Sequence, residues 1–290
     1  MIGIHLQARP AVFEDRQRIS NLIFFEAHVH RHLEWNEPLE WLGSPHFWVL
    51  EENGNLLAAL ACPLDPPGMA WVRFFAHAHK IKMEDAWSAL WRIAQGAITQ
   101  QGGATVAAIA RQTWFNDLLI SNGFHHTQDI VMLEWQRHAL PPNWLQPRAD
   151  IRAMRAEDLP RVAELDAAAF PPLWHNSMQV LKKALEQAQF ATVMEDARGL
   201  AGYQISTGNP FGAHLARLAV RPDAQGQGRG LALVCDLIRR LDWHSGARLT
   251  VNTQSDNPAS LALYRKLGFR YTGEKYPILC FEAPPQKETV

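Results

Sequence analysis

The sequence lacks three features, each of which would define a class of protein. No apolar run approaches the roughly 18–20 residues that span a bilayer, so no transmembrane helix is predicted. Its 3 cysteines, Cys62, Cys235 and Cys280, are scattered and form no CxxC pair, which argues against a disulfide framework. Lys and Arg number 28 against 29 Asp and Glu, which excludes the basic excess of a dedicated nucleic-acid binder.

Two further patterns are missing. The N-terminal segment MIGIHLQARPAVFEDR has no apolar core of the kind found in signal peptides, so we expect a cytoplasmic protein with no membrane partner. His28, His30 and His32 would share one face only on a strand, and the local sequence is more typical of a helix. No HExxH motif or cysteine cluster accompanies them, so we expect no metal site.

The composition that is present is globular, and it divides into two halves. The 290 residues, 47% hydrophobic and 20% charged, are enough for two domains. Residues 1–145 carry a net charge of −4 and residues 146–290 one of +3, and a polar, Pro-rich stretch between them is typical of a linker. We therefore predict a first domain at 1–138, a linker at 139–149 and a second domain at 150–290.

The two halves repeat each other at an offset of 143–145 residues. Four matches occur in the same order in both halves: Glu14 with Glu157, Glu51 with Glu195, Gly103 with Gly246, and Phe124 with Phe269. Each match is weak alone, but an order conserved at nearly constant spacing is hard to obtain by chance. The pattern indicates one fold present twice.

Periodicity in the second half predicts an α+β unit whose mixed, mostly antiparallel sheet is flanked by helices. Two alternating segments around a charged turn predict a hairpin, and later segments alternate between strand and helix patterns. The predicted strands are 190–195, 199–206, 214–220 and 248–252, with two short strands from Tyr271; the later helices are 231–241 and 258–267.

A glycine-rich segment lies where a predicted strand meets a predicted helix. The strand through Leu218, Ala219 and Val220 leads into a turn and then into QGQGRG, residues 225–230. Successive glycines let backbone N–H groups converge, and a helix N-terminus adds partial positive charge. The segment predicts a phosphate-sized anion site, to which Arg229 and Arg221 can add charge. It fits neither a GxxxxGK[ST] loop nor a dinucleotide-binding βαβ unit.

A second motif, NPASLALYRKLGF, begins at Asn257 after the next strand. Together with VRPDAQGQGRG it strongly resembles the GNAT superfamily of acyl-CoA-dependent N-acetyltransferases, over about residues 149–283. The matching positions are Gln225, Gly228 and Gly230 in the first motif and Asn257, Tyr264, Gly268 and Phe269 in the second. The resemblance implies two tandem GNAT-like domains, with a splayed cofactor cleft in the C-terminal copy and a degenerate form over residues 5–135.

The resemblance also implies a role for each matching residue. The backbone of Leu218, Ala219 and Val220 would pair with the pantetheine arm of coenzyme A and polarise the thioester carbonyl. Asn257 would contact the same arm. Tyr264 would be the general acid for the departing thiolate, because an ordinary Tyr is protonated at pH 7. The pyrophosphate would bind the loop residues Gln225, Gly226, Gln227, Gly228, Arg229, Gly230 and Leu231.

The general base and the acceptor stay open. Candidates for the base are His175, His214, Glu195 and Asp196, acting directly or through water. By resemblance, the acceptor is recognised by the segment 166–189. Its apolar stretch from Phe170 to Trp174 either walls an acceptor channel or plugs the core.

The first half departs from the family pattern. HAHKIKME, residues 77–84, stands where the glycine loop belongs, and Leu119 replaces the equivalent of Tyr264. We expect this half to keep the fold without binding coenzyme A productively. Its clustered tryptophans are expected in the core, with an interface or an aromatic pocket as the alternative.

Taken together, the sequence predicts an N-acetyltransferase that uses acetyl-CoA and no metal. A primary amine of a small molecule or peptide would attack the acetyl group directly in a ternary complex. Two alternatives stay open: transfer of a different acyl group, and a non-catalytic acyl-CoA sensor or scaffold, against which the retained Asn257 and Tyr264 weigh. We expect a monomer or a homodimer.

Overall fold

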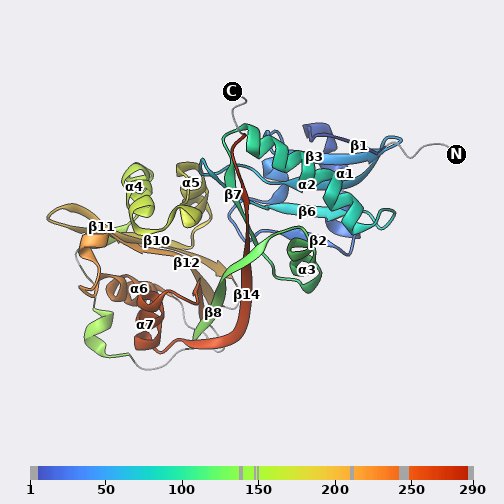
Figure 1. The fold of residues 1–290 in the computed structure, drawn as a ribbon. Coiled ribbons are helices and arrows are strands. Elements are labelled where there is room, and N and C mark those ends of the chain that lie inside the picture. The colour runs from blue at the N-terminus through green and yellow to red at the C-terminus, as the bar shows by residue number, and fades with distance from the viewer. Residues whose placement is uncertain are drawn as a thin grey trace. The chain divides into compact units, whose positions relative to one another are not determined.

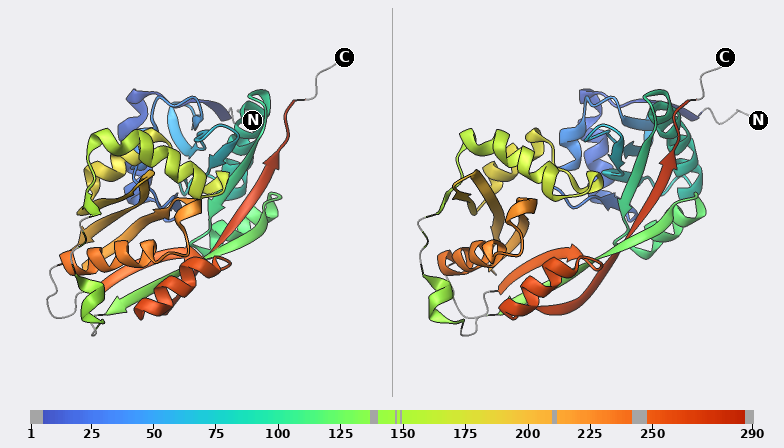
Figure 2. Two further views of the ribbon diagram at one scale, coloured as in Figure 1. Left: turned by 90° about the vertical axis from the view of Figure 1, so that its left-hand side faces the viewer. Right: turned by 60° about the vertical axis from the view of Figure 1, so that its left-hand side comes forward.

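The computed structural model describes residues 6–136, 140–146, 148, 150–209, 212–241 and 248–286. The chain forms two units: the first combines Met1–Thr127 with Pro277–Val290, and the second is Gln128–Tyr276. Both contain sheets and helices, so the predicted α+β class is confirmed (Figure 1; Figure 2). The predicted linker falls inside the second unit.

The first unit contains a five-stranded sheet, a smaller group of strands and three α-helices. The sheet has the order β1 (Leu6–Pro10), β3 (Phe47–Glu52), β4 (Asn55–Ala61), β6 (Phe74–His77) and β2 (Val29–Arg31). In the smaller group, β7 (Ala104–Ile109) pairs with β5 (Met69–Trp71) and with the end of β14 (Arg270–Ala283). The helices are α1 (Arg16–Phe25), α2 (Met83–Gln100) and α3 (Thr113–Ser121). Trp48, Trp87 and Trp91 lie in the core, as predicted.

The second unit is a single sheet with a pair of helices on each face. Its strands lie in the order β14, β8 (His125–Gln136), β13 (Arg248–Gln254), β12 (Gly212–Val220), β11 (Gly199–Asn209), β10 (Phe190–Asp196) and β9 (Ile151–Ala153). Strands β12 and β13 pair in parallel. Every neighbouring pair from β9 to β12 is antiparallel, and so is the pair of β13 with β8. Figure 1 shows α4 (Leu159–Ala169) and α5 (Met178–Gln187) on one face, and α6 (Arg229–Arg240) and α7 (Pro258–Leu267) on the other.

Two strands continue from one unit into the other. β8 begins in the first unit, and its residues Ile130–Gln136 pair with β13. β14 begins in the second unit, and its residues Ile278–Ala283 pair with β7. The prediction of two short strands from Tyr271 is wrong: β14 is one strand of 14 residues that continues past Gly273, whose φ is 92°, because it pairs with β8 and with β7.

The repeat seen in the sequence reappears as the same ion-pair network in each unit. In the first, Arg9 binds Asp15 at 2.6 Å and Glu51 at 2.7 Å. In the second, Arg152 binds Asp158 at 2.7 Å and Glu195 at 2.9 Å. The pairing holds the pKa of Asp15 and of Asp158 well below the ordinary range, through the hydrogen bond from each arginine. A second arginine, Arg18 or Arg161, joins each network.

Some helices have the bounds that the local sequence predicts, whereas one segment predicted as helix forms a strand. Helix α7 has the predicted bounds, and α6 begins two residues before the predicted start, at Arg229. The expected helix around His28, His30 and His32 is wrong at Val29–Arg31, which form strand β2. Pairing with β6 overrides the local preference there, and no group of three metal-ligating residues occurs in the described ranges.

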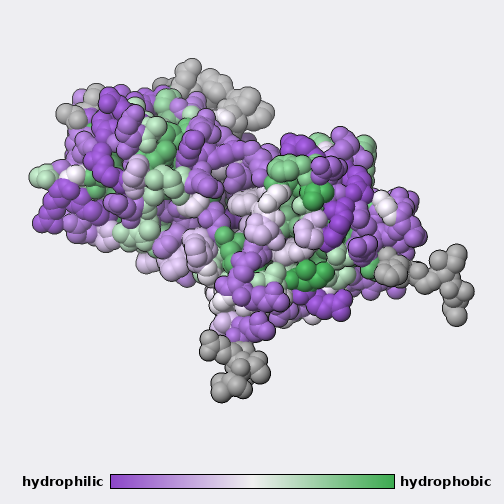
Figure 3. Space-filling model, turned by 90° about the horizontal axis from the view of Figure 1, so that it is seen from above, coloured by the Kyte–Doolittle hydropathy of each residue, from purple (hydrophilic) through white to green (hydrophobic). Residues whose placement is uncertain are grey.

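No α-helix of the described segments is long and apolar enough to cross a membrane. Seen from above, the surface mixes hydrophilic and hydrophobic residues, and hydrophobic areas are interrupted by hydrophilic ones (Figure 3). The largest exposed apolar side chains include Phe24 and Phe25 at the end of α1.

Candidate active site

The sheet of the second unit opens between β12 and β13. The two strands pair from Gly212 with Arg248 to Leu215 with Val251. Beyond that point the register places a bulge at Ala216, after which β12 pairs with β11 and β13 pairs with β8. Alternate backbone groups of Leu218–Val220 therefore point away from β11, toward the opening. The predicted splay is present, and the predicted residues Leu218, Ala219 and Val220 line it.

The glycine loop lies at the end of β12 and leads into α6. Gly226 and Gly228 adopt left-handed φ angles of 73° and 78°, and a Cβ at either would meet no atom within 4 Å. Ala232 donates the first helical hydrogen bond, to the carbonyl of Gly228 at 3.0 Å. The N–H groups at the start of α6 thus have no intrahelical acceptor, an arrangement that is suited to an anion.

At Gly230 the reason for a glycine is helix packing, not the backbone φ angle. A Cβ there would lie 3.3 Å from Leu263 Cδ2 of α7, so its small size lets the two helices approach closely. Gln225, Gln227 and Leu231 complete the segment: the two glutamines are exposed, and Leu231 packs on the core beneath.

The arginines near this loop are paired, which qualifies the prediction that they add charge. Arg229 binds Asp196 at 2.7 Å, and Arg221 binds the same carboxylate at 3.0 Å. Arg198 binds Asp223 at 2.8 Å, and Arg221 also contacts Asp223. Three guanidinium groups face two carboxylates, so one positive charge remains, and the backbone N–H groups are the main attraction for an anion.

Helix α7 carries the second motif. Asn257 caps it, accepting a hydrogen bond from Ser260 N at 3.0 Å, and Pro258 occupies the first turn. Tyr264 is 3% exposed, and its ring centroid lies 5.3 Å from that of Phe269. Burial raises the pKa of Tyr264, so the hydroxyl carries its proton at pH 7. Tyr264 is therefore a core residue whose hydroxyl stays protonated.

Sequence reasoning missed a buried network behind the predicted acceptor loop. Arg217, on β12 just after the bulge, forms a bidentate pair with Asp166 at 2.7 and 2.8 Å. Tyr203 also donates to Asp166, which is fully buried. Arg217 binds Trp174 O at 2.6 Å and stacks 3.5 Å from the ring centroid of Phe170. The available signal was a charged residue inside each of two largely apolar segments, Asp166 in LDAAAF and Arg217 in LARLAV.

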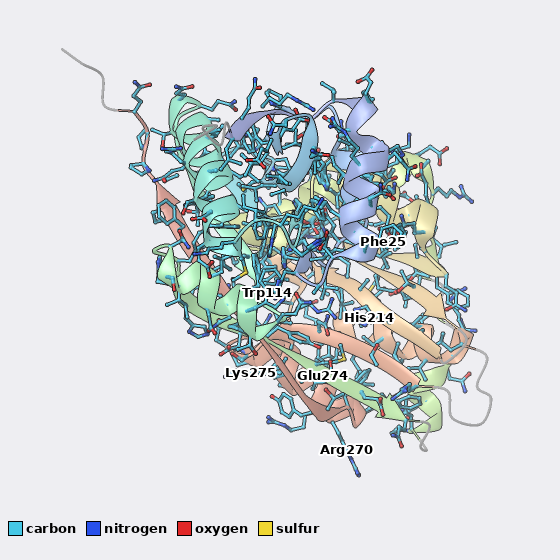
Figure 4. All side chains as sticks on the ribbon, turned by 90° about the vertical axis from the view of Figure 1, so that its right-hand side faces the viewer. Phe25, Trp114, His214, Arg270, Glu274 and Lys275 are labelled. Atoms are coloured by element: carbon cyan, nitrogen blue, oxygen red, sulfur yellow. The ribbon has the colours of Figure 1, made fainter. Side chains whose placement is uncertain are left out.

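The four candidate bases differ in their surroundings. Glu195 is held by Arg152, and Asp196 by Arg221 and Arg229. His175 Nε2 donates to Phe170 O at 2.7 Å, which leaves that nitrogen no lone pair to offer. His214 (Figure 4) is half-buried and lies on β12, where it is opposite Thr250 of β13. His214 alone combines a neutral environment with a place at the start of the splay.

The first unit fills the equivalent opening with its own chain. Its β5–β7 pair starts at Met69 with Thr105, 143 residues before the β12–β13 pair. Its strand β6 then pairs on its free side with β2, through His30 opposite Phe75. The buried His30 ring stacks 3.9 Å from Phe115 and binds Val72 O at 2.9 Å.

A strand of the protein thus occupies in the first unit the position that is open beside β12 in the second. The connection from β6 to α2, residues 78–82, contains no glycine, and Leu119 is buried on α3. We predict that calorimetry with coenzyme A gives one site per chain. Two sites per chain would contradict the plugged opening, and Gly228→Asp, which affects the second unit alone, should weaken all the binding observed.

Comparison with known proteins agrees with this geometry. The acetyltransferase (GNAT) family matches residues 159–269. The ribosomal protein bS18-alanine N-acetyltransferase of Escherichia coli K12 is 31% identical over 121 residues, which are 41% of this chain and 79% of that enzyme. A tandem GNAT protein from the clavulanic acid biosynthesis pathway has a similar fold, with a TM-score of 0.63 and 18% identity, covering 97% of this chain and 100% of that one. For a GCN5-related N-acetyltransferase from Sphaerobacter thermophilus the TM-score is 0.59 at 17% identity, covering 97% and 96%.

This chain belongs to the GNAT acetyltransferase family. It is an acyl-CoA-dependent acetyltransferase built from tandem copies of one fold.

Proposed function

We propose that this enzyme transfers the acetyl group of acetyl-CoA to a primary amine while both are bound in the second unit. The observation that carries the proposal is the splay between β12 and β13, with an anion loop at its end and a buried, protonated Tyr264 on α7. Holding both reactants in one opening makes the attack effectively intramolecular, which can lower the activation free energy by roughly 7–11 kcal/mol.

The residues around the splay fit coenzyme A. The open edge of Leu218–Val220 offers backbone groups for the pantetheine arm, and the Cβ-free loop from Gln225 to Leu231 offers N–H groups for the pyrophosphate. The Nδ2 group of Asn257, 3.5 Å from Gln254 Oε1, is the part of that side chain available to the arm. Bound there, acetyl-CoA supplies an activated thioester, and Tyr264 holds a proton for the leaving sulfur.

We predict that Gly228→Asp weakens coenzyme A binding by tenfold or more. Its side chain would enter open space beside the helix N-terminus and place a negative charge close to a pyrophosphate, at a cost of about 1.4 kcal/mol or more. Gly228→Asn is the matched control, because Asn has the same size and tolerates a positive φ similarly. Calorimetry on both variants separates charge from backbone strain; equal affinities would contradict an anion site.

Thiol release from acetyl-CoA, measured for the full chain with a panel of amines, tests the proposed function. The E. coli relative is named for an alanine of ribosomal protein bS18, so the panel includes an alanine-starting peptide beside small amines. We expect release that depends on an amine. Tight binding of acetyl-CoA without release by any amine would instead support an acyl-CoA sensor.

A further inference from the structure

One side chain at the start of the splay has a hydrogen-bond acceptor without a partner. Asn252 follows Val251, the last residue of β13 that pairs with β12. Its Oδ1 is buried and makes no hydrogen bond with the described residues. An unsatisfied buried acceptor is costly, about 1–3 kcal/mol, so its retention here calls for a ligand that donates to it.

His214 lies beside it with a second free acceptor. His214 Nδ1 is 2.9 Å from Thr250 Oγ1, and Thr250 donates its one hydroxyl proton toward Ala213 O at 3.4 Å. Thr250 must then accept from Nδ1–H, which leaves the lone pair of His214 on Nε2. Nε2 makes no hydrogen bond within the described ranges. Burial also lowers the pKa of His214, so the ring is neutral at pH 7.

Both acceptors lie on the same face of the sheet. Ala213, Leu215, Leu249 and Val251 pack in the core cluster with α6 and α7, so the alternate residues His214, Thr250 and Asn252 point to the other face. That face is the one covered by α4 and α5. Thr207, which is opposite His214, lies on the same face of β11 as Tyr203, and Tyr203 binds Asp166 of α4. Diagonal neighbours of this kind lie about 7–8 Å apart, close enough for one nitrogen to bridge their side chains.

A groove of about 1160 Å³ adjoins these residues within the second unit. Thr250, the partner of His214, lines it, as does Met132, which is opposite Asn252 on β8. Its walls also include the ion pair of Glu134 with Arg248 and the exposed Thr272. The groove is slightly larger than the roughly 300–1,000 Å³ of small-molecule pockets, and its mixed charges suit a peptide better than an apolar ligand.

We propose that Asn252 Oδ1 and His214 Nε2 form the seat of the acceptor amine, and that the adjoining groove binds the peptide behind it. The inference rests on the proposed acetyl transfer. In the step, the neutral amine attacks the acetyl carbon, a C–N bond forms and the C–S bond breaks. The nitrogen gives one proton to His214 Nε2, and the sulfur takes one from Tyr264, so the products are an amide and a thiol. Asn252 orients the amine and exchanges no proton.

Steady-state kinetics of the full chain with an alanine-starting hexapeptide and with n-butylamine test this seat. His214→Gln should lower kcat with both amines by about 10²–10⁴-fold, the usual worth of a general base, with the KM for acetyl-CoA unchanged within about twofold. Asn252→Leu should raise the KM for the amine about tenfold, whereas Asn252→Asp keeps an acceptor oxygen and should raise it less. Asn21→Leu, on an exposed part of α1, is the matched control.

A separate variant tests the groove, and the groove, the amine seat and the proposed function are each contradicted by a different result. Thr272→Trp should raise the KM of the hexapeptide and leave that of n-butylamine unchanged; equal effects on both would overturn the groove assignment. Unchanged kinetics in His214→Gln and Asn252→Leu, or a rise in their KM for acetyl-CoA, would overturn the amine seat while the proposed function stands. A wild-type enzyme that releases no thiol with either amine contradicts the proposed function itself.

Discussion

A fragment of residues 150–290 is expected not to fold, whereas residues 128–276 should form a cooperative domain. Only the fragment 128–276 keeps the part of β8 that pairs with β13 through seven residues and places Val131, Leu133 and Trp135 in the core. Trp135 also donates to Leu267 O at 2.9 Å. Burying three such side chains contributes roughly 5–9 kcal/mol, comparable with the whole stability of about 5–15 kcal/mol of a domain. Without β8, the edge of β13 is also exposed to aggregation.

Circular dichroism and thermal unfolding of 128–276 beside 150–276 make the comparison, since the two differ only by the segment that contains β8. We expect a cooperative transition for the first and none for the second. Cooperative folding of 150–290 would instead support the domain limits predicted from sequence, with a free linker at 139–149.

Tyr264→Phe should lower kcat by about 10²–10⁴-fold, because the leaving sulfur loses its proton donor. Phe fills almost the same space against Phe269, so the melting temperature should change little. Burial raises the pKa of Tyr264, which keeps the hydroxyl protonated below that raised value. Ionisation of this residue should therefore not limit the wild-type rate between pH 6 and 9.

Amine-dependent thiol release, with calorimetry for acetyl-CoA, measures that effect. Tyr276→Phe is the matched control, since it removes a hydroxyl that contacts Glu274 on β14, away from α7. Affinity for acetyl-CoA should be the same in both variants and the wild type. If Tyr264→Phe kept wild-type kcat, the sulfur would have to be protonated by another group.

The sequence predicts best those features that a short segment specifies by itself. Helix α7 is bounded correctly because Asn257, Pro258 and Gly268 are a cap, a first-turn residue and a left-handed stop. The glycine loop is likewise local, and so is its place before α6.

Features that depend on distant residues could not be predicted in this way. Strand β2 takes its conformation from β6, more than 40 residues away, against a local helical pattern. The roles of Arg217 and Asp166 arise from their ion pair across 51 residues, although each was visible as a charged residue in a largely apolar segment. The seat at His214 and Asn252 similarly needs the register of β12 with β13.

The continuous strands also fix an order of assembly during synthesis. The first unit needs Ile278–Ala283 beside β7, a pairing that joins residues such as Phe281 and Val106. The second unit, Gln128–Tyr276, is complete in sequence before those residues leave the ribosome. Domains fold as units as the chain emerges, so we expect the half that is made last, and that carries the site, to be folded before the half that is made first. The first unit stays incomplete until its last strand has been synthesised, and its strand edges are exposed until then. We expect a chaperone to be needed most during this period.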